Sequence, residues 1–489
     1  MKKTLVSLLL LLLALTMVLC SCQNSNDPNE PDTTPTDDGG ESESESTEQT
    51  GVPVVDYSIN GSPREVVLLT FGTYNTDYHF FANDMEGDAL HVEAFERTSY
   101  INEQYGVDLV AVNNANTACD ALFNSEQAGG GDYDLVYPHP DISWYNAITM
   151  GYLTDLTKCE YINFEGPWWN QSQVENYKIA GKLFFAASDF SLSGQGFAAM
   201  IYNRKLMNDL TLDKDIYDVV KDGEWTMEKL NEMVKLYGND VNEDPENALY
   251  GLMFQTTHSM SLHVATGLNF TERDDTGNFA VTISTEKVNG VATKLYDILY
   301  NNGDRVMTDT SNYGTFAASE GWAVFQEQRA LFMTYDIGAL YRYLQPLEFE
   351  IGYLPLPMYD EDQDDYKVMC AAGFFCIPAH ADDPEMSGLL LEALSVYSYE
   401  NYRPEFFNTI LLGRLSKQQK DYDMLEFLHE HKTYYIGFTF GGGAYQVLRT
   451  VVVDGKSTNT QSYMRNKYNN MMESVTLLEN LRQHIEGLD

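Results

Sequence analysis

Short apolar runs alternate with helical patterns in the folded part of this chain, and this alternation constrains the fold more than any other feature. The runs at 65–71, 106–112 and 133–137 are predicted as buried strands, and the segments 91–105 and 117–125 as helices between them. Such alternation with short connections favours right-handed crossovers and a mostly parallel sheet. Ligands bind such sheets beyond the carboxyl ends of the strands. We therefore expect Thr73, Tyr74 and His139, which follow two of these strands, to line a binding site.

The N-terminus has the three parts of a lipoprotein signal peptide. Two lysines precede an apolar run over 5–19, which is shorter than a membrane-spanning helix needs. Leu19 and Ser21 then supply the branched apolar and the small residue that a lipobox places before its cysteine, here Cys22. We expect residues 1–21 to be removed and Cys22 to be lipidated, with two acyl chains giving stable anchoring. The alternative is an ordinary secretory peptide with a chance cysteine.

Residues 22–57 are predicted to form an extended acidic tether. From Gln23 to Gly51 the chain is mainly Asn, Asp, Pro, Thr, Glu and Ser, with no lysine or arginine and almost nothing apolar. Such a segment cannot bury enough apolar surface to offset the entropy of ordering, and its like charges repel. We expect this spacer to hold the folded part away from the membrane.

The remaining chain is long enough for two lobes and is strongly acidic. Residues 1–56 hold two lysines and ten acidic residues and so account for −8 of the net charge of −43, which leaves −35 for the folded part. This excess argues against binding to nucleic acid or anionic lipid. The body also contains Cys119, Cys159, Cys370 and Cys376, without zinc-type spacing. A Cys119–Cys159 disulfide and buried free thiols are both open.

A series of short motifs runs in order through the folded part. They are Tyr133-Asp134-Leu135; Gly151, Leu153, Asp155 and Leu156; 181–185 followed by 201–206; Trp225-Thr226 with Leu230; Tyr250-Gly251-Leu252; 352–357; and Ile377-Pro378 followed by Asp383-Pro384-Glu385 and 389–394. In this order the chain resembles the extracellular solute-binding proteins of ABC importers (family 1), which include maltose-binding protein. The last motifs are most similar to a branch common in anaerobic Gram-positive bacteria.

The resemblance implies an α/β, two-lobed, periplasmic-binding-protein-like fold of type II. Each lobe would be a mostly parallel sheet flanked by helices, and crossing hinge strands would join the two. We expect lobe 1 to contain residues 58–187 and about 334–390, and lobe 2 to contain residues 188–333 and about 391–489. The chain should pass to lobe 2 near 186–199 and return near 332–336.

The sequence carries no familiar catalytic motif. It has no Gly-x-Ser-x-Gly elbow, no HExxH and no P-loop, so we expect neither enzyme activity nor a cofactor. His429 and His431 are two positions apart and would point to different faces of a helix. This spacing favours a surface pair over a metal site.

One acidic loop is a weak calcium candidate. Its oxygen-bearing residues alternate as calcium ligands do, at Asp240, Asn242, Asp244 and Glu246. A proline stands where the sharp turn needs glycine, and a glycine stands where a bidentate glutamate should close the loop. We therefore predict no metal site.

Aromatic residues indicate the ligand class. Sugar rings stack their apolar C–H faces on aromatic rings, while their hydroxyls need Asp, Asn, Gln and Arg side chains. The residues that follow strand ends or lie in late loops, and that we predict to bind ligand, are Trp144, Trp169, Asp189, Tyr335, Asp336, Phe438 and Phe440. Core packing is the alternative for each aromatic, and we assign Trp225 and Trp322 to the core.

These patterns predict an extracellular lipoprotein anchored on the outer face of the membrane of a Gram-positive cell. As a monomer it would capture a small-molecule solute, by family habit a carbohydrate or oligosaccharide, and deliver it to the transmembrane subunits of an ABC permease. The alternatives are a cell-surface glycoside-active enzyme and a solute-sensing co-receptor without transport. The enzyme would need a close pair of carboxylates in the cleft, whereas neighbouring permease or kinase genes would separate import from sensing.

Overall fold

The structure is a computed structural model, and it describes residues 51–71, 80–114, 118–138, 142–194, 197–238, 247–274, 277–309, 320–337, 347–370, 373–408, 418–440 and 443–488. The chain divides into Met1–Gln49 and a folded unit, Thr50–Asp489. The predicted signal peptide, Cys22 and most of the predicted tether therefore lie outside the described residues.

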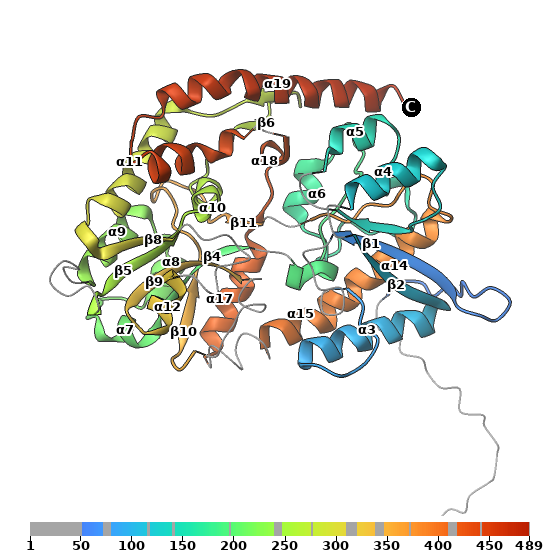
Figure 1. Cartoon of the computed structure of the whole chain (residues 1–489), viewed down its shortest axis with the longest axis horizontal. Coiled ribbons are helices and arrows are strands. Elements are labelled where there is room, and N and C mark those ends of the chain that lie inside the picture. The colour runs from blue at the N-terminus through green and yellow to red at the C-terminus, as the bar shows by residue number, and fades with distance from the viewer. Residues whose placement is uncertain are drawn as a thin grey trace, which may run out of the picture. The chain divides into compact units, whose positions relative to one another are not determined.

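The smaller sheet has three parallel strands in the order β2-β1-β3. They are β1 (Arg64–Phe71), β2 (Val107–Asn114) and β3 (Leu135–Tyr137), connected by α3 (Ala89–Tyr105) and α4 (Cys119–Ala128). This confirms the predicted alternation. Val66, Leu68 and Leu69 of β1 are fully buried, as expected for a central parallel strand. Figure 1 shows α3 and α14 (Pro384–Tyr397) on one side of the sheet and α4 and α5 (Trp144–Thr149) on the other.

Local sequence fixes both ends of α3. The side chain of Asp88 accepts a hydrogen bond from the backbone N–H of His91 and so caps the first turn. Gly106 ends the helix with φ of +62°, in the left-handed region that favours glycine. Because β2 begins at the next residue, this cap sets where the chain turns back into the sheet.

The larger sheet has five strands in the order β10-β4-β9-β5-β8. They are β4 (Ala198–Asn203), β5 (Tyr250–Gln255), β8 (Val306–Asp309), β9 (Ala330–Asp336) and β10 (Ile351–Leu354). Strand β5 is parallel to β8 and β9, whereas β4 is antiparallel to β9 and β10. Trp225 and Trp322 are buried beside this sheet, as predicted, and Trp225 Nε1 donates to the carbonyl of Pro355 at 2.9 Å.

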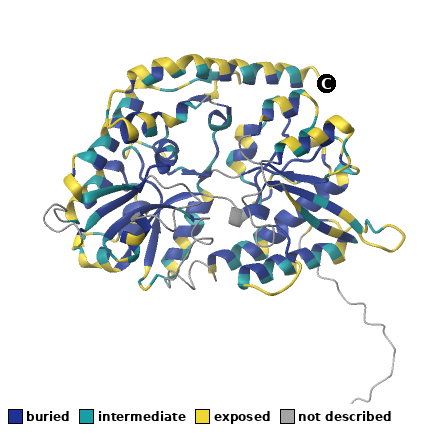
Figure 2. Ribbon diagram, in the orientation of Figure 1, coloured by how far each residue is buried: buried dark blue, intermediate teal, exposed yellow. Residues whose placement is uncertain are grey.

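We call the smaller sheet with its helices the first lobe and the larger sheet with its helices the second lobe. The helices between the strands of the second lobe are α7 (Arg204–Asp209), α8 (Ile216–Lys221), α9 (Met227–Leu236), α10 (His258–Ala265), α11 (Thr285–Tyr300) and α12 (Glu320–Gln326). Figure 2 shows that buried residues fill both sheets and that exposed residues lie on the outer helix faces. Both sheets therefore contribute to one continuous hydrophobic core.

The boundaries between the lobes differ from those that the sequence suggested. Strand β10 pairs with β4, with Gly352 opposite Tyr202, and the N–H of Met227 donates to the carbonyl of Met358. Residues 347–366 therefore lie in the second lobe, where the sequence assigned them to lobe 1. Conversely, α14 packs against α3, so residues 391–397 lie in the first lobe. The physical reason is that the chain after a buried strand such as 332–336 can either return within the same lobe or cross to the other lobe. The hydrophobic periodicity of the strand is the same in both cases, so the sequence does not distinguish them.

Segments from three parts of the chain lie side by side at the junction of the lobes. Ala186 pairs with Phe375, and Phe197 pairs with Cys370, both in antiparallel bridges. Helix α17 (Gln419–Glu430) contacts β10. It leads into β12 (Lys432–Thr433), which pairs with β11 (Val368–Met369). The junction thus combines the predicted crossing at 186–199 with a return near 370–375 and with a late segment. The return was predicted near 332–336, but those residues belong to β9 within the second lobe.

The C-terminal helix α19 (Gln461–Glu486) contacts both lobes. It packs against α5 of the first lobe and against β7 (Phe279–Val281) in the hairpin that β7 forms with β6 (Thr271–Arg273). The Glu479 carboxylate accepts a hydrogen bond from the N–H of Phe279 at 2.7 Å. Figure 1 shows α19 running across the top of the folded unit. The remaining α-helices are α6 (Gln171–Tyr177), α15 (Arg403–Glu405) and α18 (Ile436–Phe440).

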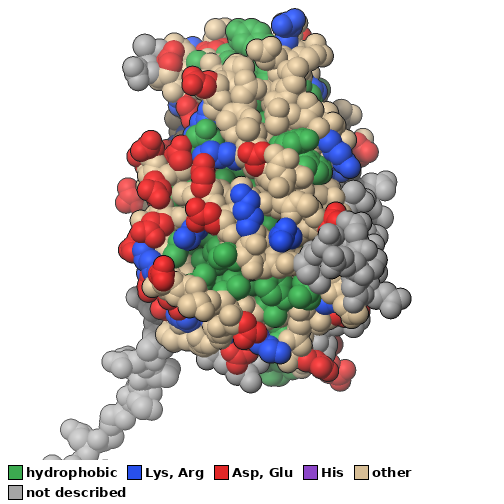
Figure 3. All heavy atoms as spheres, turned by 90° about the vertical axis from the view of Figure 1, so that its left-hand side faces the viewer, with side chains coloured by type: hydrophobic (Ala, Val, Ile, Leu, Met, Phe, Trp, Pro, Cys, Tyr) green, Lys and Arg blue, Asp and Glu red, His purple; other side chains and the backbone are tan. Residues whose placement is uncertain are grey.

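Acidic and basic side chains share the surface of the folded unit (Figure 3). On the face in Figure 3, acidic side chains gather along one edge and basic ones lie among them. Among the described residues, Cys119, Cys159, Cys370 and Cys376 form no disulfide bond with one another. In the described part of the chain, every helix is too short or too polar to cross a bilayer.

Candidate ligand-binding site

A cavity of about 250 Å³ lies where α17 and β12 meet the first lobe. Its lining residues come from four segments of the chain: Pro167, Trp169, Asn170, Gln171 and Ser172; Ser188 and Asp189; Tyr399 and Arg403; and His429, Glu430 and Lys432. Sites for drug-sized ligands typically measure about 300–1,000 Å³. The cavity therefore suits a group the size of one six-membered ring with its substituents.

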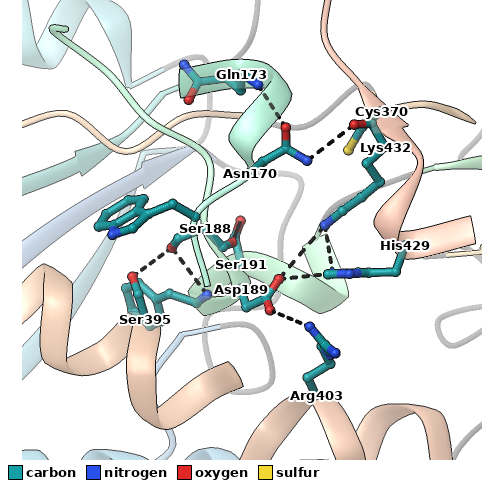
Figure 4. Close-up of polar contacts among 12 residues, drawn as sticks. Asn170, Gln173, Ser188, Asp189, Ser191, Cys370, Ser395, Arg403, His429 and Lys432 are labelled. Carbon is teal, nitrogen blue, oxygen red and sulfur yellow. Dashed lines mark hydrogen bonds and ion pairs between the residues drawn. The ribbon is translucent and has the colours of Figure 1, made fainter. Parts of the chain in front are cut away.

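Two extended segments form one wall of the cavity. Trp169 and Ser188 face each other in an antiparallel bridge. The N–H of Asn170 donates to the carbonyl of Ala187, and the N–H of Asp189 donates to the carbonyl of Trp168, each at 3.0 Å. The ladder fixes the register of the wall, and this register places the side chain of Asp189 towards the cationic residues of the late segments (Figure 4).

The Asp189 carboxylate is buried and faces three basic side chains. One oxygen lies 3.0 Å from His429 Nε2 and 3.9 Å from Lys432 Nζ, and the other accepts a hydrogen bond from Arg403 at 3.4 Å. Figure 4 shows the three basic groups converging on this side chain. Arg403 also binds Glu426 at 3.1 Å. We call Asp189, Arg403, His429 and Lys432 the Asp189 cluster.

The electrostatics of the cluster keep the carboxylate ionised. Burial alone would raise the pKa of Asp189, but His429, Lys432 and Arg403 outweigh it and hold that pKa at about 2. Burial, together with the positive charge of Lys432, lowers the pKa of His429 to about 4 in spite of Asp189. Burial also lowers the pKa of Lys432. At neutral pH, Asp189 is therefore an anion and His429 is a neutral imidazole.

This arrangement suits the binding of hydroxyl groups better than acid catalysis. A carboxyl group with a lowered pKa is a poor general acid near neutral pH. The Nε2 atom of neutral His429 can donate to Asp189 or accept from Lys432, at 2.8 Å, but cannot do both. A ligand hydroxyl both donates and accepts hydrogen bonds, so it can bind whichever of Asp189 and Lys432 the imidazole does not bind.

Aromatic rings complete the lining. Trp169 lies in the wall, and its indole N–H donates to Glu392 at 2.9 Å. Tyr399 is half-buried, and the guanidinium of Arg403 lies over its ring, 4.5 Å from the ring centre. Trp168 meets the Tyr399 ring edge-on at 6.2 Å. The cavity thus offers both rings and charged hydrogen-bonding groups, the two components that recognition of a polyhydroxylated ring requires.

Asp189 and Trp169 are the sequence-predicted residues that line this cavity. Trp169 and Trp144 are both 1% exposed, but Trp144 does not line the cavity and stacks on Phe185 at 4.0 Å, so its side chain has the core role that was the alternative. Tyr335 is fully buried against Trp322, 5.3 Å between ring centres. Strand ends predict position along a strand, but they do not predict which face of the sheet a side chain joins.

The other predicted ligand residues lie elsewhere. Asp336 is half-buried at the end of β9. Phe438 and Phe440 belong to α18, where Phe438 packs on Tyr445 with 4.4 Å between ring centres and Phe440 is buried. Thr73, Tyr74, His139 and the calcium candidates Asp240, Asn242, Asp244 and Glu246 fall outside the described residues. The predicted set therefore does not form a single site among the described residues.

Sequence reasoning missed Tyr399, Arg403, His429 and Lys432. His429 is 8% exposed, so the expectation of a surface histidine pair is wrong for this residue. A signal was present, because His429 follows Leu425 at the helical spacing of four on the buried face of α17. Arg403 and Lys432 gave no such signal, since long-range pairing alone brings them to Asp189.

A second cavity of about 520 Å³ lies within the second lobe. Its lining includes five acidic residues, Asp222, Glu224, Glu361, Asp364 and Asp365. Across the described ranges, no three His, Cys, Asp or Glu side chains are grouped so as to hold a metal ion. We assign no ligand to this cavity.

Comparison with solved structures identifies the fold. A cyclo/maltodextrin-binding protein complexed with maltotetraose has a TM-score of 0.55 and 15% identity, covering 86% of this chain and 97% of that one. The ABC substrate-binding protein Lmo0181 of Listeria monocytogenes, in complex with cycloalternan, has a TM-score of 0.51 and 12% identity, covering 87% and 99%. This chain has the fold of an ABC substrate-binding protein. The GacH receptor of Streptomyces glaucescens is similar to the same extent, with a TM-score of 0.52, 12% identity and coverage of 85% and 99%. No family model and no curated protein sequence matches the chain.

The two-lobed expectation is confirmed by this likeness, and the neighbours are binding proteins. At identities of 12–15%, this likeness shows the fold. The Asp189 cluster joins first-lobe residues to α17 and β12. The candidate site therefore lies where the two lobes of the folded unit meet.

We predict that His429→Gln reduces the loss of stability in mild acid. The pKa of His429 is 6.5 as a free group and about 4 when folded, so the unfolded chain takes up a proton first. Its contribution is fully present above pH 6.5 and is lost as the pH falls to 4, about 3 kcal/mol in all. Urea unfolding between pH 4 and 7.5 measures the slope, to which the buried His258 and His263 contribute in both proteins.

His484→Gln, on α19 and outside the cluster, is the matched control and should leave the slope unchanged. An equal slope in wild type and His429→Gln would show that His429 is not held neutral by its burial in the cluster.

Proposed function

We propose that this chain is the solute-binding lipoprotein of an ABC importer and that it captures a carbohydrate, most simply an oligosaccharide, between its two lobes. The observation that carries the proposal is the Asp189 cluster beside Trp169 and Tyr399 at the junction of the lobes. The similar proteins were solved with maltotetraose and cycloalternan, which supports a sugar as the ligand class.

Binding would proceed without covalent chemistry. A sugar ring would pack on the aromatic wall, and its hydroxyls would exchange hydrogen bonds with Asp189, Arg403 and His429. Because these groups come from both lobes, a bound sugar favours the closed arrangement over the open one. The closed form would then dock on the transmembrane subunits and release its solute.

Calorimetric titration with maltotetraose, other linear and cyclic glucans, and monosaccharides tests this function. We expect at least one saccharide to bind and to raise the melting temperature. Tyr399→Ala should weaken that binding about tenfold, or 1.4 kcal/mol, because it removes an aromatic face and the support of Arg403.

Tyr296→Ala is the matched control, since Tyr296 is a half-buried tyrosine of α11 outside the cavity. It should leave saccharide affinity unchanged. Binding of peptides or polyamines alone would rule out the carbohydrate assignment, and turnover of a bound sugar would rule out a purely binding role.

We also propose that Cys22 carries the lipid that tethers the protein to the outer face of the membrane. The lipobox Leu19-Cys20-Ser21-Cys22 and the acidic spacer after it support this. In a Gram-positive host, Cys22→Ser should move the protein from the membrane fraction to the medium. Retention of Cys22→Ser in the membrane fraction would contradict the proposal.

A further inference from the structure

One buried carboxylate lies directly behind the cavity wall. Glu392 of α14 is 2% exposed. One of its oxygens accepts the indole N–H of Trp168 at 3.0 Å, and the other accepts the indole N–H of Trp169 at 2.9 Å. Two consecutive tryptophans are thus held by the two oxygens of one side chain.

Both tryptophans are connected to the cavity through contacts, Trp169 directly and Trp168 through Tyr399. Trp169 lines it directly. Trp168 meets the ring of Tyr399 at 6.2 Å, and Tyr399 in turn lies under Arg403, which binds Asp189. A change in the position of Glu392 would therefore reach the aromatic wall and the cation that holds the buried anion.

The same helix also supports the second strand of the wall. Ser395, one helical turn after Glu392, donates from its hydroxyl to the Ser188 hydroxyl at 2.8 Å (Figure 4). Ser188 pairs with Trp169 and directly precedes Asp189. Side chains three positions apart lie on one face of a helix, so α14 presents Glu392 and Ser395 together to the two segments of the wall.

We propose that Glu392 is a positioning residue of the candidate site, whose ionised carboxylate orients Trp168 and Trp169 and thereby sets the affinity for the ligand. The proposal rests on the proposed function, because it takes the cavity to be the place where the saccharide binds. Glu392 acts through the two indoles and does not touch the ligand itself.

Only an ionised carboxylate can make both bonds well. Both of its oxygens are acceptors, whereas a protonated carboxyl or an amide turns one acceptor into a donor that faces an indole N–H. Burial raises the pKa of Glu392 to about 7, although the bonds from Trp169, Trp168 and the backbone at Asn163 oppose the shift. The carboxylate therefore loses its charge in a pH range that solution experiments reach easily.

Three of the other titratable groups around the wall keep their charge state in this range. Asp189 and His429, on the cavity side, have pKa values of about 2 and 4, and Arg403 has its pKa raised by Asp189 and Glu426 in spite of burial. Lys432 has its pKa lowered by burial. Within the described residues, no charged side chain is among the causes of the shift at Glu392.

The first test uses the ligand-free protein, so that it does not depend on the identity of the solute. Near-ultraviolet circular dichroism between pH 5.5 and 8.5 reports the asymmetry around the tryptophans. We expect a transition near pH 7 in wild type and none in Glu392→Gln. Trp168→Phe removes one of the two indole donors, so the remaining transition should move to higher pH, because the ionised form loses a hydrogen bond.

Asp134→Asn is the matched control, because Asp134 is another buried carboxyl of the first lobe with a raised pKa and a backbone hydrogen bond from Val67. It should keep the transition near pH 7. A wild type without this transition, or a transition unmoved in both Glu392→Gln and Trp168→Phe, would overturn the role of Glu392.

The second test measures saccharide affinity at pH 6 and pH 8. We expect wild type to bind about tenfold more weakly at pH 6, and Glu392→Gln to bind weakly at both. Absence of saccharide binding to wild type would refute the proposed function, whereas the dichroism result would still decide the positioning of the indoles. Tight binding by Glu392→Gln with an unchanged pH dependence would refute the positioning role alone.

Discussion

The buried anion of Asp189 is the interaction on which the junction of the lobes depends. Its partners come from residues far apart in sequence, namely Arg403 after α14, and His429 and Lys432 around the end of α17. Moving such charges out of water is costly, and the network repays that cost only while every partner is in place. The cluster therefore ties the late segments to the first lobe more specifically than apolar contacts could.

Different residues around this anion support the cavity wall and line the cavity. Helix α14 supports the wall from behind through Glu392 and Ser395, and the wall contributes Trp169 and Asp189 to the lining of the cavity. Helix α19 contacts both lobes at some distance from the site. Under the proposed function the lobes open and close, which needs a site assembled from both lobes on rigid elements, and these helices would provide the rigid part.

The fold was largely predictable from the sequence, and the site was not. Apolar runs bounded by glycine and proline gave β1, β2 and β3 to within two residues, because burial on both faces of a parallel strand leaves a continuous signal. The sequence did not indicate to which lobe β10 belongs, since its apolar run fits either lobe. The sequence also gave no sign that Arg403 and Lys432 face Asp189, because this pairing joins residues more than two hundred positions apart.

The aromatic prediction shows the same limit on a smaller scale. Trp169 and Trp144 carried similar sequence signals, yet Trp169 lines the cavity whereas Trp144 stacks on Phe185 in the core. The difference arises because Trp169 is paired with Ser188 at the edge of the cavity, whereas Trp144 begins a helix packed over the sheet. Residue type indicates that an aromatic face is available, and only the tertiary contacts decide what covers it.

The most direct measurement is a crystal structure of the protein with a bound oligosaccharide. We expect a sugar ring against Trp169 and Tyr399, with a hydroxyl within hydrogen-bonding distance of the Asp189 carboxylate. A saccharide bound elsewhere, with the Asp189 cluster closed off from it, would contradict the central claim that this cluster is the recognition site.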